Sequence, residues 1–79
     1  MAVDVRLRQI VASVLGVSAR DLSDSDSPET LQSWDSVSHI QLVVALEAEF
    51  GIEFSPEEIV ELNSIGEIRE RIAARVGEP

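Results

Sequence analysis

The stretch Ser36–Phe50, SVSHIQLVVALEAEF, decides the fold of this 79-residue chain. Residues that can face a core recur in it every three or four positions, the spacing of one face of an α-helix. That stripe consists of His39, Leu42, Val43, Leu46 and Phe50. Gly51 follows, where a glycine commonly ends a helix. The pattern therefore predicts a helix over residues 36–50.

The same periodicity predicts three further helices around this one. The first covers residues 2–15 and carries an apolar stripe from Val3 to Val14. Ser55 and Pro56 supply an N-cap and a first-turn proline, and they open a short helix over residues 56–62. Ser64 caps a last helix over residues 65–76. No segment alternates with the period of a strand, so we expect an all-α fold, a small four-helix bundle with three long helices and one short helix.

A long segment, residues 17–35, separates the first two helices. It is rich in Ser and Asp and contains Pro28, which is typical of a loop. Four apolar residues are spaced as if to attach this loop to a core: Val17, Leu22, Leu31 and Trp34. We expect a long loop pinned to a single domain that spans residues 1–79.

Charge and composition exclude several classes of function. Fifteen acidic residues stand against six basic ones, giving a net charge of −9, and twelve of the acids lie between Asp21 and Glu67, where there is no Lys or Arg. Such a surface repels nucleic acid and anionic membranes and favours basic protein partners. Without cysteine there is no disulfide or thiolate site. No apolar run is long enough to span a membrane, and the N-terminus lacks a signal-peptide pattern. We expect a monomeric cytoplasmic protein.

Catalytic and metal-binding constellations are scarce. His39 is the only histidine, and a lone histidine in a helical core stripe is most often structural. Asp21, Asp24 and Asp26 lack the central glycine and terminal glutamate of a calcium loop. The sequence therefore predicts neither a catalytic residue nor a metal site, and we do not expect an enzyme.

The Asp35-Ser36 pair at the start of the long helix has two interpretations. In the structural one, Asp35 caps the helix and Ser36 is simply its first residue. In the functional one, the Ser36 hydroxyl is a covalent attachment point, since a phosphodiester there would lie at the positive end of the helix. Val37, Ile40 and Val44 form a second apolar series beside it, which a modifying enzyme could grip.

Asp35-Ser36-Val37, followed at this spacing by Ala45-Leu46-Glu47 and Glu49-Phe50-Gly51-Ile52, resembles the acyl carrier protein signature. The resemblance extends over most of the chain. It implies that a phosphopantetheinyl transferase uses coenzyme A and magnesium to attach 4′-phosphopantetheine to Ser36, with Asp35 beside the attachment point. The thiol of the arm would hold acyl, aminoacyl or polyketide intermediates as thioesters for partner enzymes.

The resemblance also implies partners and surfaces. Acyltransferases, adenylating enzymes or ligases, and ketosynthase-type enzymes would dock through basic patches. The residues expected to face these partners are Val37, Ile40, Gln41, Val44, Glu47, Glu53 and Glu57. The residues expected to line a space for the acyl chain are His39, Leu46 and Ile59.

Departures from the family pattern bear on the pathway. Ser38, Gln41 and Ala48 stand where fatty-acid carriers usually have acids, and Val37 replaces the usual leucine. Trp34 before the Asp-Ser pair is more similar to carriers of polyketide and non-ribosomal-peptide assembly lines. We therefore expect a discrete carrier of specialised metabolism, such as antibiotic biosynthesis. Periodicity and composition alone leave open an alternative, a small acidic helical protein-interaction domain without a prosthetic group.

Overall fold

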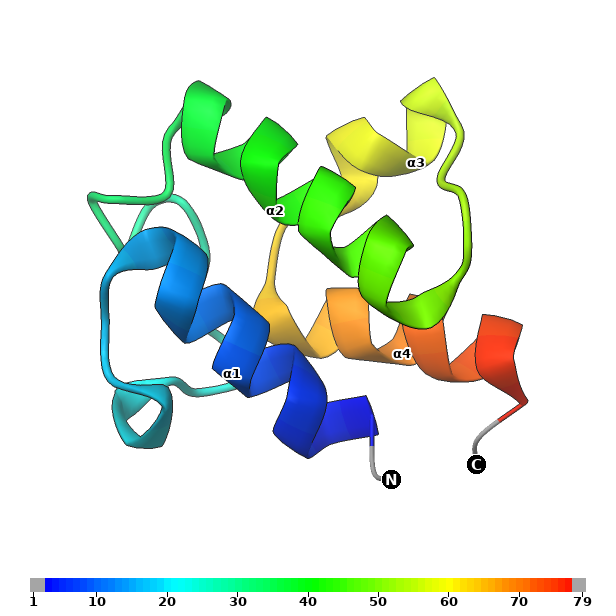
Figure 1. Cartoon of the computed structure of the whole chain (residues 1–79). Helices are drawn as coiled ribbons and strands as arrows, with labels where there is room; N and C mark the ends of the chain where they lie inside the picture. The colour runs from blue at the N-terminus through cyan, green and yellow to red at the C-terminus, as the bar shows by residue number, and fades with distance from the viewer. Residues whose placement is uncertain (1–2, 78–79) are drawn as a thin grey trace.

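The computed structural model describes residues 3–77 and forms a small helical bundle in that range (Figure 1). Its elements are α1 (Val3–Leu15), a 3-10 turn η1 (Ala19–Asp21), α2 (Ser36–Phe50), α3 (Pro56–Glu61) and α4 (Ile65–Val76). The described residues contain no strand, and the expected all-α fold is confirmed. The short helix ends at Glu61, one residue before the predicted boundary, and the predicted start of the first helix at residue 2 lies outside the described residues.

Both ends of α2 are defined by local chemistry. The side chain of Asp35 accepts a hydrogen bond from the backbone N–H of Ser38 at 2.9 Å, which satisfies one of the free donors of the first turn. At the other end Gly51 has a φ of +66°, a conformation that suits glycine, and its N–H donates to the carbonyl of Glu47. Helix α2 therefore presents Asp35 and Ser36 at a sharply defined N-terminus.

The core is built mainly by α1, α2 and α4. Leu7 and Val11 of α1, Leu42 and Leu46 of α2, and Ile68 of α4 have no exposed surface. By contrast, α3 contributes no buried residue and packs through the partly buried Ile59. The position of α3 beside α2 therefore depends on few contacts, a point that bears on the site described below.

The long loop is attached to the core as the sequence predicts. Leu22 and Trp34 are buried, and Val17 and Leu31 pack against the core from partly buried positions. Backbone hydrogen bonds join the loop to the start of α4, where the N–H groups of Ile65 and Gly66 donate to carbonyls of the loop. These attachments fix the segment that leads into Asp35.

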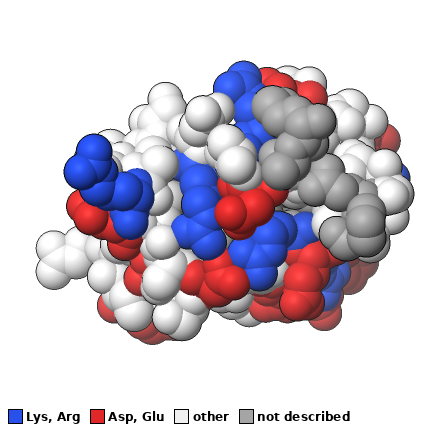
Figure 2. All heavy atoms as spheres, turned by 90° about the horizontal axis from the view of Figure 1, so that it is seen from below, with Lys and Arg blue, Asp and Glu red and all other residues white. Residues whose placement is uncertain are grey.

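A cluster of charged side chains links α1, the loop and α4. Arg8 and Arg69 both donate to Asp24, with N–O distances of 2.6 Å, and both also contact Asp4. Figure 2 shows arginine and carboxylate side chains interleaved on the face seen from below the view of Figure 1. Basic charge on this face is thus largely compensated. None of the helices formed by residues 3–77 combines the length and the apolar character needed to cross a bilayer.

Candidate functional site

Asp35 and Ser36 lie together at the exposed N-terminus of α2. The carboxylate of Asp35 caps the helix, so the structural interpretation of this residue is correct. Its hydrogen bond from the Ser38 N–H holds the pKa of Asp35 below the usual value for an aspartate. Because Asp35 performs the capping, the Ser36 side chain remains exposed for other chemistry.

The helix itself favours an anion at this position. Aligned peptide dipoles give the N-terminus of an α-helix a partial positive charge, which stabilises a nearby anion by roughly 0.3–1 kcal/mol at an exposed site. Helix α2 has fifteen residues, and no acidic residue occupies its first turn. A phosphate group esterified to Ser36 would therefore lie in a favourable field.

A cavity of about 510 Å³ opens next to Ser36. It lies between the end of the long loop, the first turns of α2, and α3. Its lining residues are Pro28, Trp34, Asp35, Ser36, His39, Ile40, Ile59, Val60 and Asn63. Two of the three residues expected to line an acyl-chain space, His39 and Ile59, are among them. The third, Leu46, lies in the core with no exposed surface and is not part of this lining.

Trp34, expected to anchor the loop and to indicate the type of pathway, also lines the cavity. Its indole Nε1–H donates to Nδ1 of His39 at 2.9 Å, and Nε2 of His39 lies 2.8 Å from the carbonyl oxygen of Ile59. The two rings are nearly parallel, with an interplanar angle of 22° and centroids 6.1 Å apart. Trp34 stands two residues before α2 in the sequence, which was the available signal for a role at this site. The spacing of residues alone could not indicate that His39 is its hydrogen-bond partner.

Exposed apolar side chains surround the site. Val37, Ile40 and Val44 of α2 expose 67%, 54% and 59% of their surface, so the second apolar series remains at the surface as expected. Val60 of α3, which the sequence analysis did not single out, is 75% exposed and borders the same cavity. We call these four residues the apolar rim: Ile40 and Val60 line the cavity, and Val37 and Val44 lie about one turn of α2 on either side of Ile40. Exposed apolar surface of this kind marks interaction sites when it is contiguous.

The polar residues expected to face partners are in different situations. Gln41, Glu53 and Glu57 are exposed, and neither Glu53 nor Glu57 forms an ion pair within residues 3–77. In contrast, the carboxylate of Glu47 accepts the backbone N–H of Phe54 at 2.8 Å. Glu47 thus has a structural contact that the sequence pattern could not indicate.

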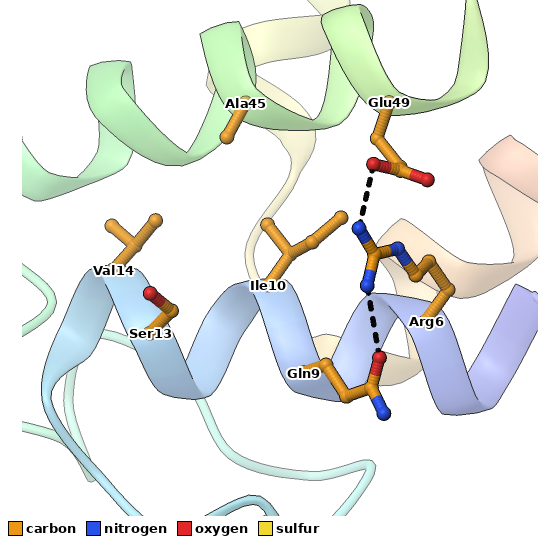
Figure 3. A pocket seen from close by; sticks show the side chains of 7 residues that line it. All are labelled: Arg6, Gln9, Ile10, Ser13, Val14, Ala45 and Glu49. Atoms are coloured by element: carbon orange, nitrogen blue, oxygen red, sulfur yellow. Dashed lines mark hydrogen bonds and ion pairs between the residues drawn. The ribbon is translucent and has the colours of Figure 1, made fainter.

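A second hollow, of about 320 Å³, lies between α1 and α2. Figure 3 shows Ile10 and Val14 of α1 facing Ala45 of α2 across it, with an ion pair between Arg6 and Glu49 at one end. None of the residues expected to carry the attached group or its cargo lines this hollow. The cavity beside Ser36 is therefore the better candidate for a functional site.

Comparisons with known proteins indicate the family. The family model described as "Phosphopantetheine attachment site" matches residues 5–72. An acyl carrier protein of Clostridium acetobutylicum is 32% identical over 73 residues, which cover 92% of this chain and 95% of that protein. The part of the chain matched in each comparison includes the Asp35-Ser36 pair and at least part of each of the four helices.

Proposed function

Because this chain belongs to the acyl carrier protein family, a family of carriers that bear 4′-phosphopantetheine on a serine, we propose that Ser36 is the attachment site. The observation that carries the proposal is the position of Ser36. Its exposed hydroxyl stands at the positive end of α2 and borders a cavity of about 510 Å³. We further propose that residues 1–79 act as one carrier domain.

The residues around Ser36 fit the group. The N-terminus of α2 favours the phosphodiester, and the neighbouring cavity has apolar walls, Ile40 and Val60, against which the arm can lie. When bound, the arm supplies the terminal thiol that this cysteine-free chain lacks, and an acyl group is held there as a thioester. The chain itself contributes the exposed hydroxyl of Ser36, the positive end of α2 and the apolar walls of the cavity.

Asp35 has two tasks in this proposal. Its carboxylate caps α2, and the same contact lowers the pKa of Asp35, which favours the ionised form. An anionic carboxylate next to the Ser36 hydroxyl suits a transferase reaction that proceeds with a divalent cation on coenzyme A. Asp35 is thus a positioning residue for loading and not a catalyst in this chain.

Partner enzymes are proposed to dock on the α2 and α3 side of the molecule. The apolar rim of Val37, Ile40, Val44 and Val60 provides contact area, with Gln41 exposed beside it on α2. The carboxylates of Glu53 and Glu57 add negative charge without forming an ion pair within residues 3–77, although Arg75 donates to the backbone carbonyl of Glu53. Exposed charges of this kind accelerate encounter with basic surfaces more than they strengthen the final complex. The proposed partners are a phosphopantetheinyl transferase and enzymes that load, extend or release the cargo.

The pathway is proposed to be one of specialised metabolism. On α2 the positions of Ser38, Gln41 and Ala48 carry no charge, so this helix is less acidic than expected for a general fatty-acid carrier. Trp34 before the Asp-Ser pair supports the same proposal. Enzymes of polyketide or peptide-type assembly lines are therefore the proposed partners.

The test is transfer of the arm in vitro. The protein is incubated with a broad-specificity phosphopantetheinyl transferase, coenzyme A and magnesium, and its intact mass is measured. The wild type should gain one arm, Ser36→Ala should gain none, and the matched control Ser33→Ala, at an exposed position of the loop, should gain it normally. A mass gain in Ser36→Ala would show that another residue is modified. No gain in the wild type would favour a protein-interaction domain without a prosthetic group.

A further inference from the structure

A chain of hydrogen bonds crosses from the end of the long loop through α2 to α3 at the cavity beside Ser36. It runs from Trp34 Nε1–H to His39 Nδ1, at 2.9 Å, and from His39 Nε2 to the carbonyl oxygen of Ile59, at 2.8 Å. An indole nitrogen can only donate, so Nδ1 of His39 is the acceptor. The hydrogen of the neutral ring is then on Nε2, which donates to Ile59. One tautomer of His39 satisfies both neighbours, and we call this arrangement the Trp34–His39–Ile59 link.

The link joins the buried Trp34 and helix α2 to helix α3. Helix α3 is six residues long and has no buried residue. Its other contacts are the packing of the partly buried Ile59 and ion pairs from Glu58 and Glu61 to arginines of α4, so the ion pairs attach it to α4 and not to α2. The carbonyl of Ile59 lies in the last turn of α3 and also accepts the N–H of Leu62 at 3.4 Å, so the bond from His39 is the shorter of its two. Trp34 is only 2% exposed, and without His39 its N–H would be buried without an acceptor. Opening a path between α2 and α3 therefore requires breaking satisfied polar contacts.

The residues of the link are more buried than the side walls of the cavity. Trp34 is buried and His39 and Ile59 are partly buried, whereas the side walls Ile40 and Val60 are 54% and 75% exposed. The space between the exposed walls is therefore an open groove with the linked residues at its base. Core residues such as Leu46 do not line it. A group lying in this groove is covered on one side and remains in water on the other.

Resting on the assignment of the arm to Ser36, we propose that the Trp34–His39–Ile59 link keeps this groove shallow and thereby restricts the cargo it can cover to short acyl groups. Apolar cargo stabilises a folded carrier only to the extent that its methylene groups leave water. A short acyl group can lie within the groove, whereas the additional methylene groups of a longer chain extend past the exposed walls. His39 is in this view the residue that determines specificity for chain length, because it makes both hydrogen bonds of the link.

The test compares short and long cargo on the same protein. Wild type and variants are loaded by the transferase from butyryl- or octanoyl-coenzyme A, loading is verified by intact mass, and Tm is measured for each form. A ligand that binds only the folded state raises Tm, and in a domain of this size each fully buried methylene group is worth roughly 3–6 °C. For the wild type, the octanoyl and butyryl forms should melt within about 2 °C of each other, less than one buried methylene group.

Variants of His39 separate the link from general packing. His39→Ala removes both hydrogen bonds and the ring, and its octanoyl form should melt at least about 6 °C above its butyryl form, since several methylene groups become buried. His39→Gln keeps an acceptor for Trp34 and a donor for Ile59, and it should behave like the wild type. Glu70→Ala, at an exposed position of α4, is the control and should also behave like the wild type. Should His39→Ala not fold, Trp34→Phe replaces it, because it removes the donor and keeps an aromatic ring.

Three results would overturn the inference. They are a strong octanoyl stabilisation in the wild type, no octanoyl stabilisation when the link is broken, or a His39→Gln protein that behaves like His39→Ala. A failure of loading at Ser36, seen directly in the mass, refutes the proposed function and the inference with it. Normal loading with one of the three results refutes the inference alone.

Discussion

Glu47 is predicted to stabilise the segment between α2 and α3, and not to contact partner enzymes directly. Its carboxylate accepts the backbone N–H of Phe54 at 2.8 Å, and its own carbonyl accepts the N–H groups of Gly51 and Ile52. Phe54 is 7% exposed, and the guanidinium of Arg75 lies 5.2 Å from its ring centroid. One glutamate thus joins the end of α2 to the residue that returns the chain to the core.

The size of the effect follows from the contact. Glu47→Ala leaves the N–H of Phe54 without its acceptor, and hydrogen bonds to charged groups contribute about 1.5–3 kcal/mol to stability. The contact is only partly buried, which lowers the expectation to roughly 1–2 kcal/mol of unfolding free energy. A domain of this size shifts its Tm by about 4–8 °C per kcal/mol, so Glu47→Ala should melt roughly 4–16 °C lower. Glu47→Gln keeps an acceptor oxygen and should lose less than about 1 kcal/mol.

The assay separates stability from docking. Urea unfolding gives the free energy of each variant, and the rate of arm loading by the transferase at low and high salt reports docking. Glu47→Gln should load at the wild-type rate, whereas the charge reversal Glu57→Lys should slow loading mainly at low salt, since Glu57 is exposed and unpaired within the described residues. The reasoning fails if Glu47→Ala is as stable as the wild type. It also fails if Glu47→Gln slows loading as strongly as Glu57→Lys.

Two further predictions concern stability. Hydrogen bonds from Arg75 and from the backbone of Ser55 lower the pKa of Glu58 to about 2, so its contribution is complete above about pH 4.5 and is lost as the pH falls toward 2. Glu58→Gln should therefore flatten the pH dependence of the unfolding free energy in that window, measured by urea titrations at fixed pH, and an unchanged slope would contradict the assignment. Leu46→Ala should lower the unfolding free energy by about 2–5 kcal/mol while the folded fraction still gains the arm, because Leu46 is a fully buried core residue. A loss of less than about 1 kcal/mol would instead place Leu46 outside the core.

The helices were predictable because their determinants are local. The boundaries of α2 depend on Asp35 and Gly51, which stand immediately beside the helix. Its existence follows from apolar residues that recur with the helical period, a pattern visible in the sequence itself. The end of α3 was misplaced by one residue because Leu62 leaves the helix with φ −80° and ψ 79° although it continues the apolar pattern. Periodicity reports which face is apolar, and it does not report where the backbone stops being helical.

The site was only partly predictable because several of its contacts are tertiary. Asp35 and Ser36 are adjacent in sequence, so their position at a helix N-terminus follows from capping rules. His39 also fits the core stripe by its spacing, but its two hydrogen-bond partners come from the preceding loop and from α3. The helical pattern of apolar residues therefore could not indicate the two hydrogen bonds of His39. Glu47 is similar, since its spacing is that of a surface acid and its partner, Phe54, lies beyond the helix.

The folded chain also redistributes the negative charge that the sequence concentrates between Asp21 and Glu67. Of the six arginines, all of which lie outside that window, five form ion pairs: Arg6, Arg8, Arg69, Arg71 and Arg75. Their partners within the window are Asp24, Glu49, Glu58, Glu61 and Glu67.

The other acids of that window form no ion pair within the described residues. They are Asp21, Asp26, Glu29 and Asp35 before Ser36 in the chain, and Glu47, Glu53 and Glu57 after it. Pairing by arginines from both ends of the chain thus leaves Asp35 as the acid without an ion pair next to Ser36, while carboxylates and arginines alternate on the face shown in Figure 2. Because exposed charge is screened over about 8–10 Å at physiological ionic strength, this arrangement orients a basic partner only at close approach. We therefore expect the contact that holds the partner to come from the exposed apolar rim of Val37, Ile40, Val44 and Val60.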